Sequence, residues 1–413
     1  MPYFNSNETE KWKKVPSMKT PRDGFGATEI GDKIYVAGGF DENNNDLSSA
    51  EVYDSKSNKW SHLPDMNEKR DYCAVTSVDG KVYVVGGIVH DADGGWNDTI
   101  FASCEMFDPA TNEWSTIPDM KIAREGCAAC AIGNKLYVIG GSNYDDGCLS
   151  SVEVFDTITK KWSSLPNMIT KRDGCAAVTV GNNIYVFGGA GNDVHLSKAE
   201  VYDATTQEWT ELSEMKEKRS SCTATAVGNR IYIVGGYYCF TVYSSCAVFD
   251  TFTNTWSYSI PDMKENKRGC EAVTVGPKIY VMGGNDGRFT TSLVEVFDIS
   301  TYSLYPTDDN YVTMEDGYRS PKSLENLCID QFCRSLPDLD GDIPPGKPQY
   351  IIDAILESLV SHGGLNESIL KAFRNYELDQ LPLTRCSGKR EVKLLSQSET
   401  LNERKCKRFK SHV

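Results

Sequence analysis

Short apolar runs recur along most of the chain, each about five residues long and bounded by polar residues and glycine. Lys33–Val36 and Lys81–Val85 are representative, because both combine β-branched residues with a tyrosine. Runs of this kind predict β-strands that are buried on both faces. A pair of glycines follows each run, where we expect the chain to turn and other backbone or side chains to come close.

The glycine pairs are evenly spaced. The six pairs are Gly38-Gly39, Gly86-Gly87, Gly140-Gly141, Gly188-Gly189, Gly235-Gly236 and Gly283-Gly284. Successive pairs lie 48, 54, 48, 47 and 48 residues apart. A period near fifty residues is too long for helical solenoids and suits the four-stranded blade of a β-propeller.

Each unit repeats a longer template around its glycine pair. A tyrosine stands three residues before the pair, and an aromatic-Asp dipeptide such as Tyr53-Asp54 follows it. Six residues after this aspartate comes a tryptophan in five units: Trp60, Trp114, Trp162, Trp209 and Trp256. This pattern closely resembles the kelch repeat over residues 10–306. The resemblance implies an all-β fold, a six-bladed kelch β-propeller.

The sixth unit is incomplete at its end. Leu304 stands where the template requires a tryptophan, while a surplus Trp12 precedes the first full unit. We therefore predict that an N-terminal strand near Trp12 completes the last blade, whose other strands come from residues 269–298. Such closure removes open sheet edges.

Charge and cysteine content narrow the functional class. The chain has 58 acidic and 43 basic residues, for a net charge of −15. This charge argues against general binding to nucleic acid or a membrane surface, and residues 1–12 are polar, without an apolar leader segment. Of the 14 cysteines, four recur at one repeat position (Cys73, Cys127, Cys175 and Cys222), and Cys270 is a shifted equivalent. This recurrence predicts buried thiols in a reducing compartment. We expect a cytoplasmic protein, with a nuclear location left open.

An arginine opens each unit and is the first candidate for ligand binding. The set is Arg22, Arg70, Arg124, Arg172, Arg219 and Arg268. The kelch resemblance places this position close to the channel, where guanidinium groups would suit the carboxylates of a peptide. The same arginine belongs to the general repeat pattern, so we expect most of the set to be scaffold and a minority to contact ligand.

The loops after the glycine pairs are the second candidate, because there the units stop resembling each other. The residues that we single out in them are Trp96, Tyr144, His195, Tyr238, Phe240, Arg288 and Phe289. Variable, aromatic-rich loops on a regular scaffold are typical of a recognition surface for a target protein or peptide. Packing of these aromatic residues against neighbouring loops is the alternative.

Catalysis and metal binding find little support in the sequence. Only five histidines occur, and their spacing is not that of a shared metal site. No pair of carboxylates is singled out by the pattern. We therefore expect no enzyme activity, no metal and no cofactor.

The strand pattern stops near Ser320. Beyond it, Leu324, Leu327, Cys328 and Phe332 share one helical face. The segment from Ser323 resembles an elongin-binding box, with Ser323, Leu324 and Cys328 matching and Phe332 departing from the usual smaller aliphatic residue. The resemblance implies that the leucine and cysteine insert into an apolar pocket of an adaptor.

Two further helices are predicted over residues 351–360 and 366–373, and the three together resemble the box modules of cullin-type ubiquitin ligase receptors. The same stretch also resembles a degenerate F-box, which docks a different adaptor, and a helical appendix is the plain alternative. We divide the chain into a propeller (10–306), a linker (307–320), a helical box-like module (321–387) and a basic disordered tail (388–413). Residues 378–386 match the start of a leucine-rich repeat, although one repeat cannot bury its own face.

The sequence thus favours a non-catalytic substrate receptor of a cullin–RING ubiquitin ligase. Its propeller would bind a target peptide, and its box would dock elongin B/C or an F-box-type adaptor and, through it, a cullin. A general kelch scaffold, cytoskeletal for example, is the main alternative, and a propeller enzyme is the third.

Overall fold

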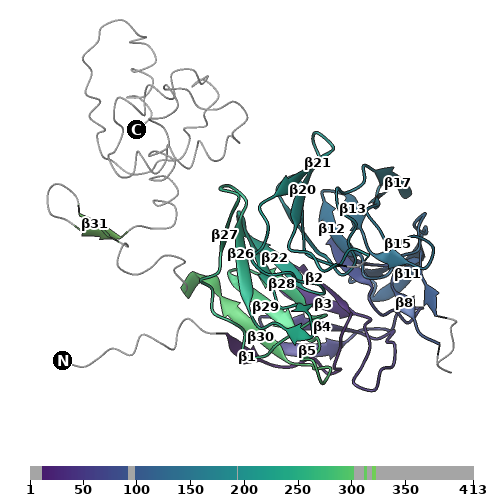
Figure 1. Ribbon diagram of the computed structural model, residues 1–413. Helices are drawn as coiled ribbons and strands as arrows, with labels where there is room; N and C mark the ends of the chain where they lie inside the picture. The colour runs from purple at the N-terminus through teal and green to yellow at the C-terminus, as the bar shows by residue number, and fades with distance from the viewer. Residues whose placement is uncertain (1–11, 92–97, 193, 302–310, 314–318, 322–413) are drawn as a thin grey trace, which may run out of the picture. The chain divides into compact units, whose positions relative to one another are not determined.

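The computed structural model describes residues 12–91, 98–192, 194–301, 311–313 and 319–321. Two units are distinguished, residues 1–304 and 305–413. Within the first unit, the described residues form an all-β propeller of six four-stranded antiparallel sheets (Figure 1). The predicted six-bladed propeller is confirmed.

Each blade begins with an innermost strand that lines the central channel. These strands are β2 (Gly26–Ile30), β6 (Ala74–Val78), β12 (Ala128–Ile132), β18 (Ala176–Val180), β22 (Thr223–Val227) and β28 (Glu271–Val275). The second strands contain the apolar runs of the sequence and are almost fully buried. They are β3 (Lys33–Ala37), β7 (Lys81–Val85), β13 (Lys135–Ile139), β19 (Asn183–Phe187), β23 (Arg230–Val234) and β29 (Lys278–Met282).

The third strand of each blade ends at the aromatic-Asp dipeptide. These strands are β4 (Ala50–Asp54), β10 (Cys104–Asp108), β16 (Val152–Asp156), β20 (Ala199–Asp203), β26 (Cys246–Asp250) and β30 (Val294–Asp298). The aspartate caps the next turn, because Asp54 Oδ1 accepts the backbone N–H groups of Lys56 and Ser57. The outer strands are β5 (Lys59–His62), β11 (Glu113–Ile117), β17 (Lys161–Leu165), β21 (Glu208–Leu212), β27 (Thr255–Ser257) and β1 (Lys13–Val15).

Strand β1 is the outer strand of the sixth blade. It pairs antiparallel with β30, with Lys13 opposite Val296 and Val15 opposite Val294. The Trp12 side chain is only 1 % exposed, and its ring centroid lies 5.2 Å from that of Phe297. Its indole N–H donates to the Pro261 carbonyl at 2.8 Å. The two ends of the propeller sequence are therefore joined in one sheet.

The tryptophans also connect neighbouring blades. In each blade the indole stacks on the aromatic residue of the third strand, as Trp114 does on Phe107 at 5.2 Å. Its N–H reaches a backbone carbonyl beyond the outer strand of the preceding blade, which for Trp114 is that of Pro64. Each tryptophan thus satisfies its polar atom and packs its ring between two blades.

The glycine pairs make close contacts between blades. Gly39 N–H donates to the Arg70 carbonyl of the next blade at 2.8 Å, and Gly38 has φ +72°. A Cβ atom added to Gly38 would lie 2.5 Å from the same carbonyl oxygen. Only glycine combines this backbone conformation with this contact.

Outside the propeller, the described residues form one small antiparallel strand pair, β31 (Tyr311–Thr313) with β32 (Arg319–Pro321). This pair lies within the predicted linker and ends one residue beyond it. The predicted helical module and tail otherwise lie outside the described residues. Among the described residues of the whole chain, no helix is long and apolar enough to cross a membrane.

We predict that Trp12→Ala lowers the free energy of unfolding by about 3 kcal/mol or more, since it removes a buried indole and its hydrogen bond. Lys13→Ala, an exposed neighbour in β1, is the matched control. Urea unfolding of the full chain measures both. Equal stability of the two variants would mean that β1 does not hold the ring closed.

Candidate binding site at one mouth of the channel

The turns that precede the innermost strands form a rim around one mouth of the channel. One residue of each turn has positive φ, and backbone hydrogen bonds link these residues from blade to blade. The bonds run from Gly24 to Gly269, Gly269 to Ser221, Ser221 to Gly174, Gly174 to Gly126 and Gly126 to Tyr72. This near-complete ring fixes the position of the side chain just before each of its members.

We call those preceding residues the rim residues. They are Asp23, Asp71, Glu125, Asp173, Ser220 and Arg268. Each forms a β-bridge with the residue that follows the glycine pair of its own blade, as Asp23 does with Phe40 and Asp71 with Ile88. The rim and the variable loops after the glycine pairs therefore belong to the same mouth.

Four neighbouring rim residues are carboxylic acids, and we call Asp23, Asp71, Glu125 and Asp173 the acidic arc. Burial raises the pKa of Asp71 to about 9, and the charges of Asp23, Asp46 and Glu125 act in the same direction. Burial likewise raises the pKa of Glu125 to about 7, with Asp173 adding to it. It raises the pKa of Asp23 and of Asp173 to about 6. Asp23 and Asp71 are buried and Glu125 and Asp173 are half-buried, near enough for the charge of one to raise the pKa of the next.

His90 and Asp46 join the acidic arc from the loops of blades 2 and 1. His90 Nδ1 lies 2.9 Å from Asp46 Oδ1, and the His90 backbone N–H donates to Asp46 Oδ2. One ligand atom each from Asp46, Asp71 and His90 lie within 4.8 Å of one another, a spacing that could hold a metal ion. Sequence reasoning missed this cluster, because its members lie on three separate segments with no shared motif.

The other side of the mouth is aromatic and cationic; we call Lys218, Tyr237, Tyr238 and Arg268 the aromatic arc. Arg268 lies over the Tyr237 ring at 5.5 Å, and Lys218 Nζ lies 5.6 Å from the Tyr238 ring centroid. The His195 ring packs edge-on against Tyr237 at 4.9 Å. The charge of the mouth thus changes sign from blades 1–4 to blades 5–6.

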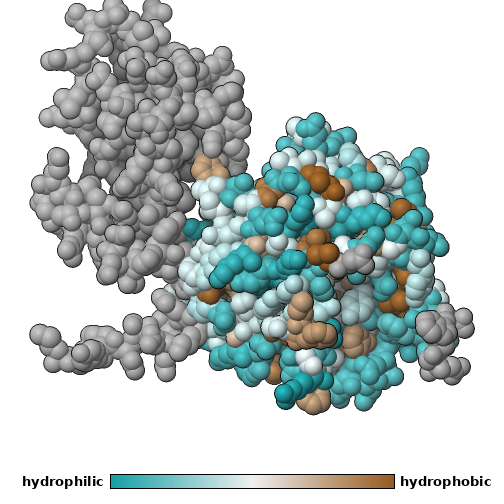
Figure 2. Space-filling model, in the orientation of Figure 1, coloured by the Kyte–Doolittle hydropathy of each residue, from teal (hydrophilic) through white to brown (hydrophobic). Residues whose placement is uncertain are grey.

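Three of the predicted loop aromatics project into solvent. Tyr144, Phe240 and Phe289 are largely exposed, and Phe240 is at the tip of the hairpin formed by β24 (Tyr237–Tyr238) and β25 (Thr241–Val242). Arg288, beside Phe289, is also exposed. Figure 2 shows hydrophobic residues scattered singly among hydrophilic ones on the visible face of the propeller. Trp96 lies outside the described residues, as do Leu324, Leu327, Cys328 and Phe332.

Five of the six predicted arginines are completely buried: Arg22, Arg70, Arg124, Arg172 and Arg219. Arg124 shows the arrangement, since its Nη1 donates to the carbonyls of Gly140 and Ser151 and its Nη2 to Glu153 at 3.0 Å. These guanidinium groups hold the glycine pair of their own blade and do not line the channel mouth. The scaffold interpretation, which the sequence favours for most of the set, describes all five.

Arg268 requires a correction. The buried scaffold position of blade 6 is occupied by Lys267, whose Nζ donates to the Gly283 carbonyl at 3.1 Å. Arg268 is one residue further and is a rim residue, partly exposed. The assumed alignment of Arg268 with the other arginines is therefore wrong, and Cys270 is in register with the other repeat cysteines. Of the set, Arg268 alone is placed to meet a ligand at the mouth.

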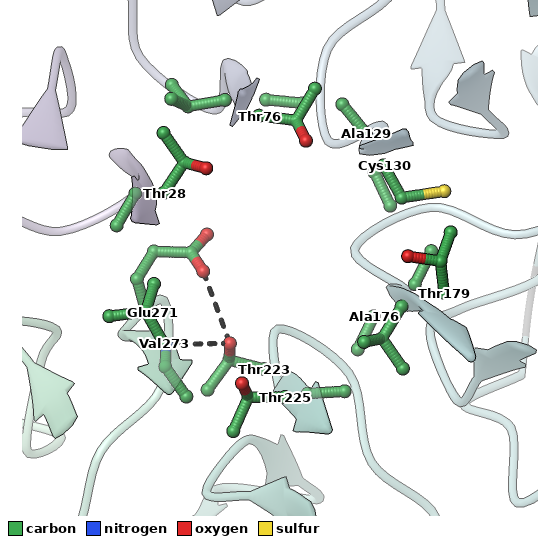
Figure 3. A pocket seen from close by; sticks show the side chains of 18 of the residues that line it. Thr28, Thr76, Ala129, Cys130, Ala176, Thr179, Thr223, Thr225, Glu271 and Val273 are labelled. Carbon is green, nitrogen blue, oxygen red and sulfur yellow. Dashed lines mark hydrogen bonds between the residues drawn. The ribbon is translucent and has the colours of Figure 1, made fainter. Parts of the chain in front are cut away.

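Below the rim, the channel is a cavity of about 350 Å³ lined mainly by alanine, threonine, valine and cysteine. Glu271, the first residue of β28, points its carboxyl group into this space (Figure 3). The Thr223 hydroxyl donates to it at 3.2 Å, and burial raises its pKa to about 8. The other innermost strands begin with glycine, alanine or threonine, so Glu271 is not part of the repeat.

The KLHDC2/KLHL20/DRC7 Kelch-repeats domain model matches residues 2–171 and 126–310. The chain belongs to this kelch-repeat family. The predicted kelch resemblance is thereby confirmed, and the family and the fold together are consistent with a protein-binding role.

Relatives match this kelch-repeat protein over short segments. Human Kelch-like protein 25 is 50 % identical over 48 residues, which are 12 % of this chain and 8 % of the relative. Kelch-like protein 26 of Danio rerio is 27 % identical over 134 residues, which are 32 % of this chain and 22 % of the relative. An F-box/kelch-repeat protein of Arabidopsis thaliana is 48 % identical over 46 residues, which are 11 % of this chain and 12 % of the relative. The matched segments are under a quarter of these relatives' lengths.

A solved structure supports the fold. The structure of YjhT superposes with a TM-score of 0.61 at 16 % identity, covering 68 % of this chain and 95 % of that one. This likeness concerns the propeller architecture alone.

We predict that Arg124→Met lowers the free energy of unfolding by about 3 kcal/mol or more, because Glu153 would remain buried without its cation. Lys121→Met removes an exposed cation that bonds Ser164 and keeps the backbone N–H that donates to the same glutamate, so it should have a small effect. Thermal and urea unfolding measure the difference. If Arg124→Met is as stable as the control, the buried pair is not required by the scaffold.

We also predict a pH-dependent gain in stability for Asp71→Asn. The folded pKa of Asp71, about 9, lies above the unfolded value of about 4, so its stabilising contribution is complete below pH 4 and is lost as the pH rises toward 9. Asparagine does not ionise. The free energy of unfolding of the variant, relative to that of wild type, should therefore rise by up to about 1 kcal/mol for each pH unit between pH 5 and 8. Urea unfolding at several pH values tests this, with exposed Asp119→Asn as control. A pH-independent difference would contradict it.

Proposed function

We propose that this protein is a non-catalytic binding module whose propeller mouth holds a segment of a target protein. The observation that carries the proposal is the combination, at one mouth, of exposed aromatic side chains with charged rim residues. Phe240 and Phe289 are exposed on loops that the rigid scaffold supports, whereas a structural aromatic residue would be buried. Aromatic anchors beside charged groups are typical of protein interaction surfaces.

We further propose that the chain serves as a substrate receptor of a cullin–RING ubiquitin ligase. The support is the elongin-binding-box resemblance of residues 323–332, the Kelch-like relatives, and the relative that combines an F-box with kelch repeats. In this role the propeller selects the target and residues 321–387 dock the adaptor. A kelch scaffold without a ligase partner is the second candidate, because the mouth alone accounts for target binding.

The mouth is tested by affinity capture from cell extract with the full chain, followed by mass spectrometry. We predict that Phe240→Ala together with Phe289→Ala removes most captured proteins while thermal stability stays unchanged, since both side chains are exposed. Ile158→Ala is the matched control, because Ile158 is as exposed but lies in the β16–β17 turn, at the strand ends opposite the glycine pairs. Identical capture by the double variant and by wild type would contradict binding at this mouth.

The ligase role is tested separately, by pull-down of the full chain with elongin B/C and with an F-box-type adaptor. We expect one adaptor to bind and Leu324→Glu together with Cys328→Asp to abolish that binding, while target capture is kept. If neither adaptor binds wild type and the double variant changes no partner, the scaffold alternative holds.

A further inference from the structure

The acidic arc differs from the buried glutamates on the third strands of blades 1 to 4. Glu51, Glu105, Glu153 and Glu200 each face a buried arginine at 2.8–3.3 Å. Among the described residues, no ion pair involves Asp23, Asp71, Glu125 or Asp173. The scaffold thus pairs these four glutamates, whereas the acids of the mouth form no ion pair.

Asp23 shows how the fold maintains this arrangement. It is 1 % exposed, and its Oδ2 atom has no hydrogen-bond partner among the described residues. Its Oδ1 atom lies over Gly269, where an added Cβ would approach to 1.8 Å, so the glycine makes room for the carboxyl group. Arg268 is near enough to act on the pKa of Asp23 but forms no ion pair with it. A buried carboxylate oxygen without a partner is costly unless a ligand completes it.

Glu271 continues the acidic surface into the channel. It follows Gly269 by two residues, and two strand residues span about 7 Å, close to the length of an extended lysine or arginine side chain. Its carboxyl group points into the cavity, where it accepts a hydrogen bond from the neutral Thr223 hydroxyl (Figure 3). A cationic side chain that passes the rim beside Asp23 would end at Glu271.

We propose that the mouth binds a target-protein segment through one lysine or arginine side chain, which crosses the acidic arc and pairs with Glu271 in the channel. This inference rests on the proposed binding function and specifies the chemistry of the segment. The charge of the mouth fits it, since four rim acids without an ion pair, with Glu271 below them, attract a cation. Lys218 and Arg268 repel a cation from the rings of Tyr237 and Tyr238, which leaves these rings for apolar groups and the side of the mouth at Asp23 for the cation.

The test is a selection of random seven-residue peptides, displayed on phage, on the full chain. EDTA is present throughout, so that no metal ion at Asp46, Asp71 and His90 mediates binding. We expect the enriched peptides to share a lysine or arginine at one position, and its replacement by norleucine to weaken binding about tenfold or more. Enriched peptides that lack a cation contradict this inference alone. Failure to enrich any peptide contradicts the proposed binding function as well.

Variants of the chain locate the cation. Glu271→Gln and Asp23→Asn should each weaken the best peptide about tenfold, while exposed Asp119→Asn leaves its affinity unchanged. Circular dichroism and thermal unfolding show that each variant is folded. If both Glu271→Gln and Asp23→Asn bind as wild type does, the cation does not enter the channel and the proposal fails.

The chain's own basic tail is the competing occupant, because Arg404, Lys405 and Arg408 carry the same chemistry. The triple variant Arg404→Gln, Lys405→Gln and Arg408→Gln in the full chain should bind the selected peptide as wild type does. About tenfold tighter binding by this variant would overturn the assignment of the mouth to another protein.

Discussion

Each blade is attached to the next by a glycine pair that lies between two cationic residues. The arginine of the same blade holds the carbonyl of the first glycine, as Arg70 Nη1 does for Gly86 at 2.8 Å. The backbone carbonyl of the next blade's arginine accepts the N–H of the second glycine, as that of Arg124 does for Gly87 at 2.9 Å. A side chain on the first glycine would collide with the next blade's arginine carbonyl, and one on the second with the rim of its own blade. The regular ring, and with it the channel and both mouths, depends on this contact.

The same contact explains why the rim can vary. The buried arginine, or Lys267 in blade 6, holds the glycine pair of its own blade, and the ring of backbone hydrogen bonds holds the residue after it at the mouth. Blades 1 to 4 place an acid there, blade 5 a serine and blade 6 an arginine. The side chains of the rim can therefore change while the contacts between blades stay the same.

The fold was predictable from the sequence because its signals are local and repeated. The glycine pairs, the aromatic-Asp dipeptides and the tryptophans each have a structural role that can be recognised within a single repeat. Arg268 was misaligned because a single Lys-for-Arg exchange at Lys267 shifted the apparent motif by one residue. The acidic arc and the Asp46–Asp71–His90 cluster were not predictable, because their members meet only when the ring closes. Glu271 could have been found from the sequence, because it is a glutamate at a strand position where the other units have small residues or threonine.

Closure by Trp12 and β1 also constrains how the chain acquires its structure. The Trp12–Pro261 hydrogen bond joins residues 249 positions apart, so the first strand of the sequence is the last to find its partner. During synthesis, residues 12–15 must wait until β30 has emerged, with the indole unburied. Such a long-range pairing makes the final step slow relative to the hairpins within each blade. The open edge of β30 in that interval is the point at which another chain's strand could take the place of β1.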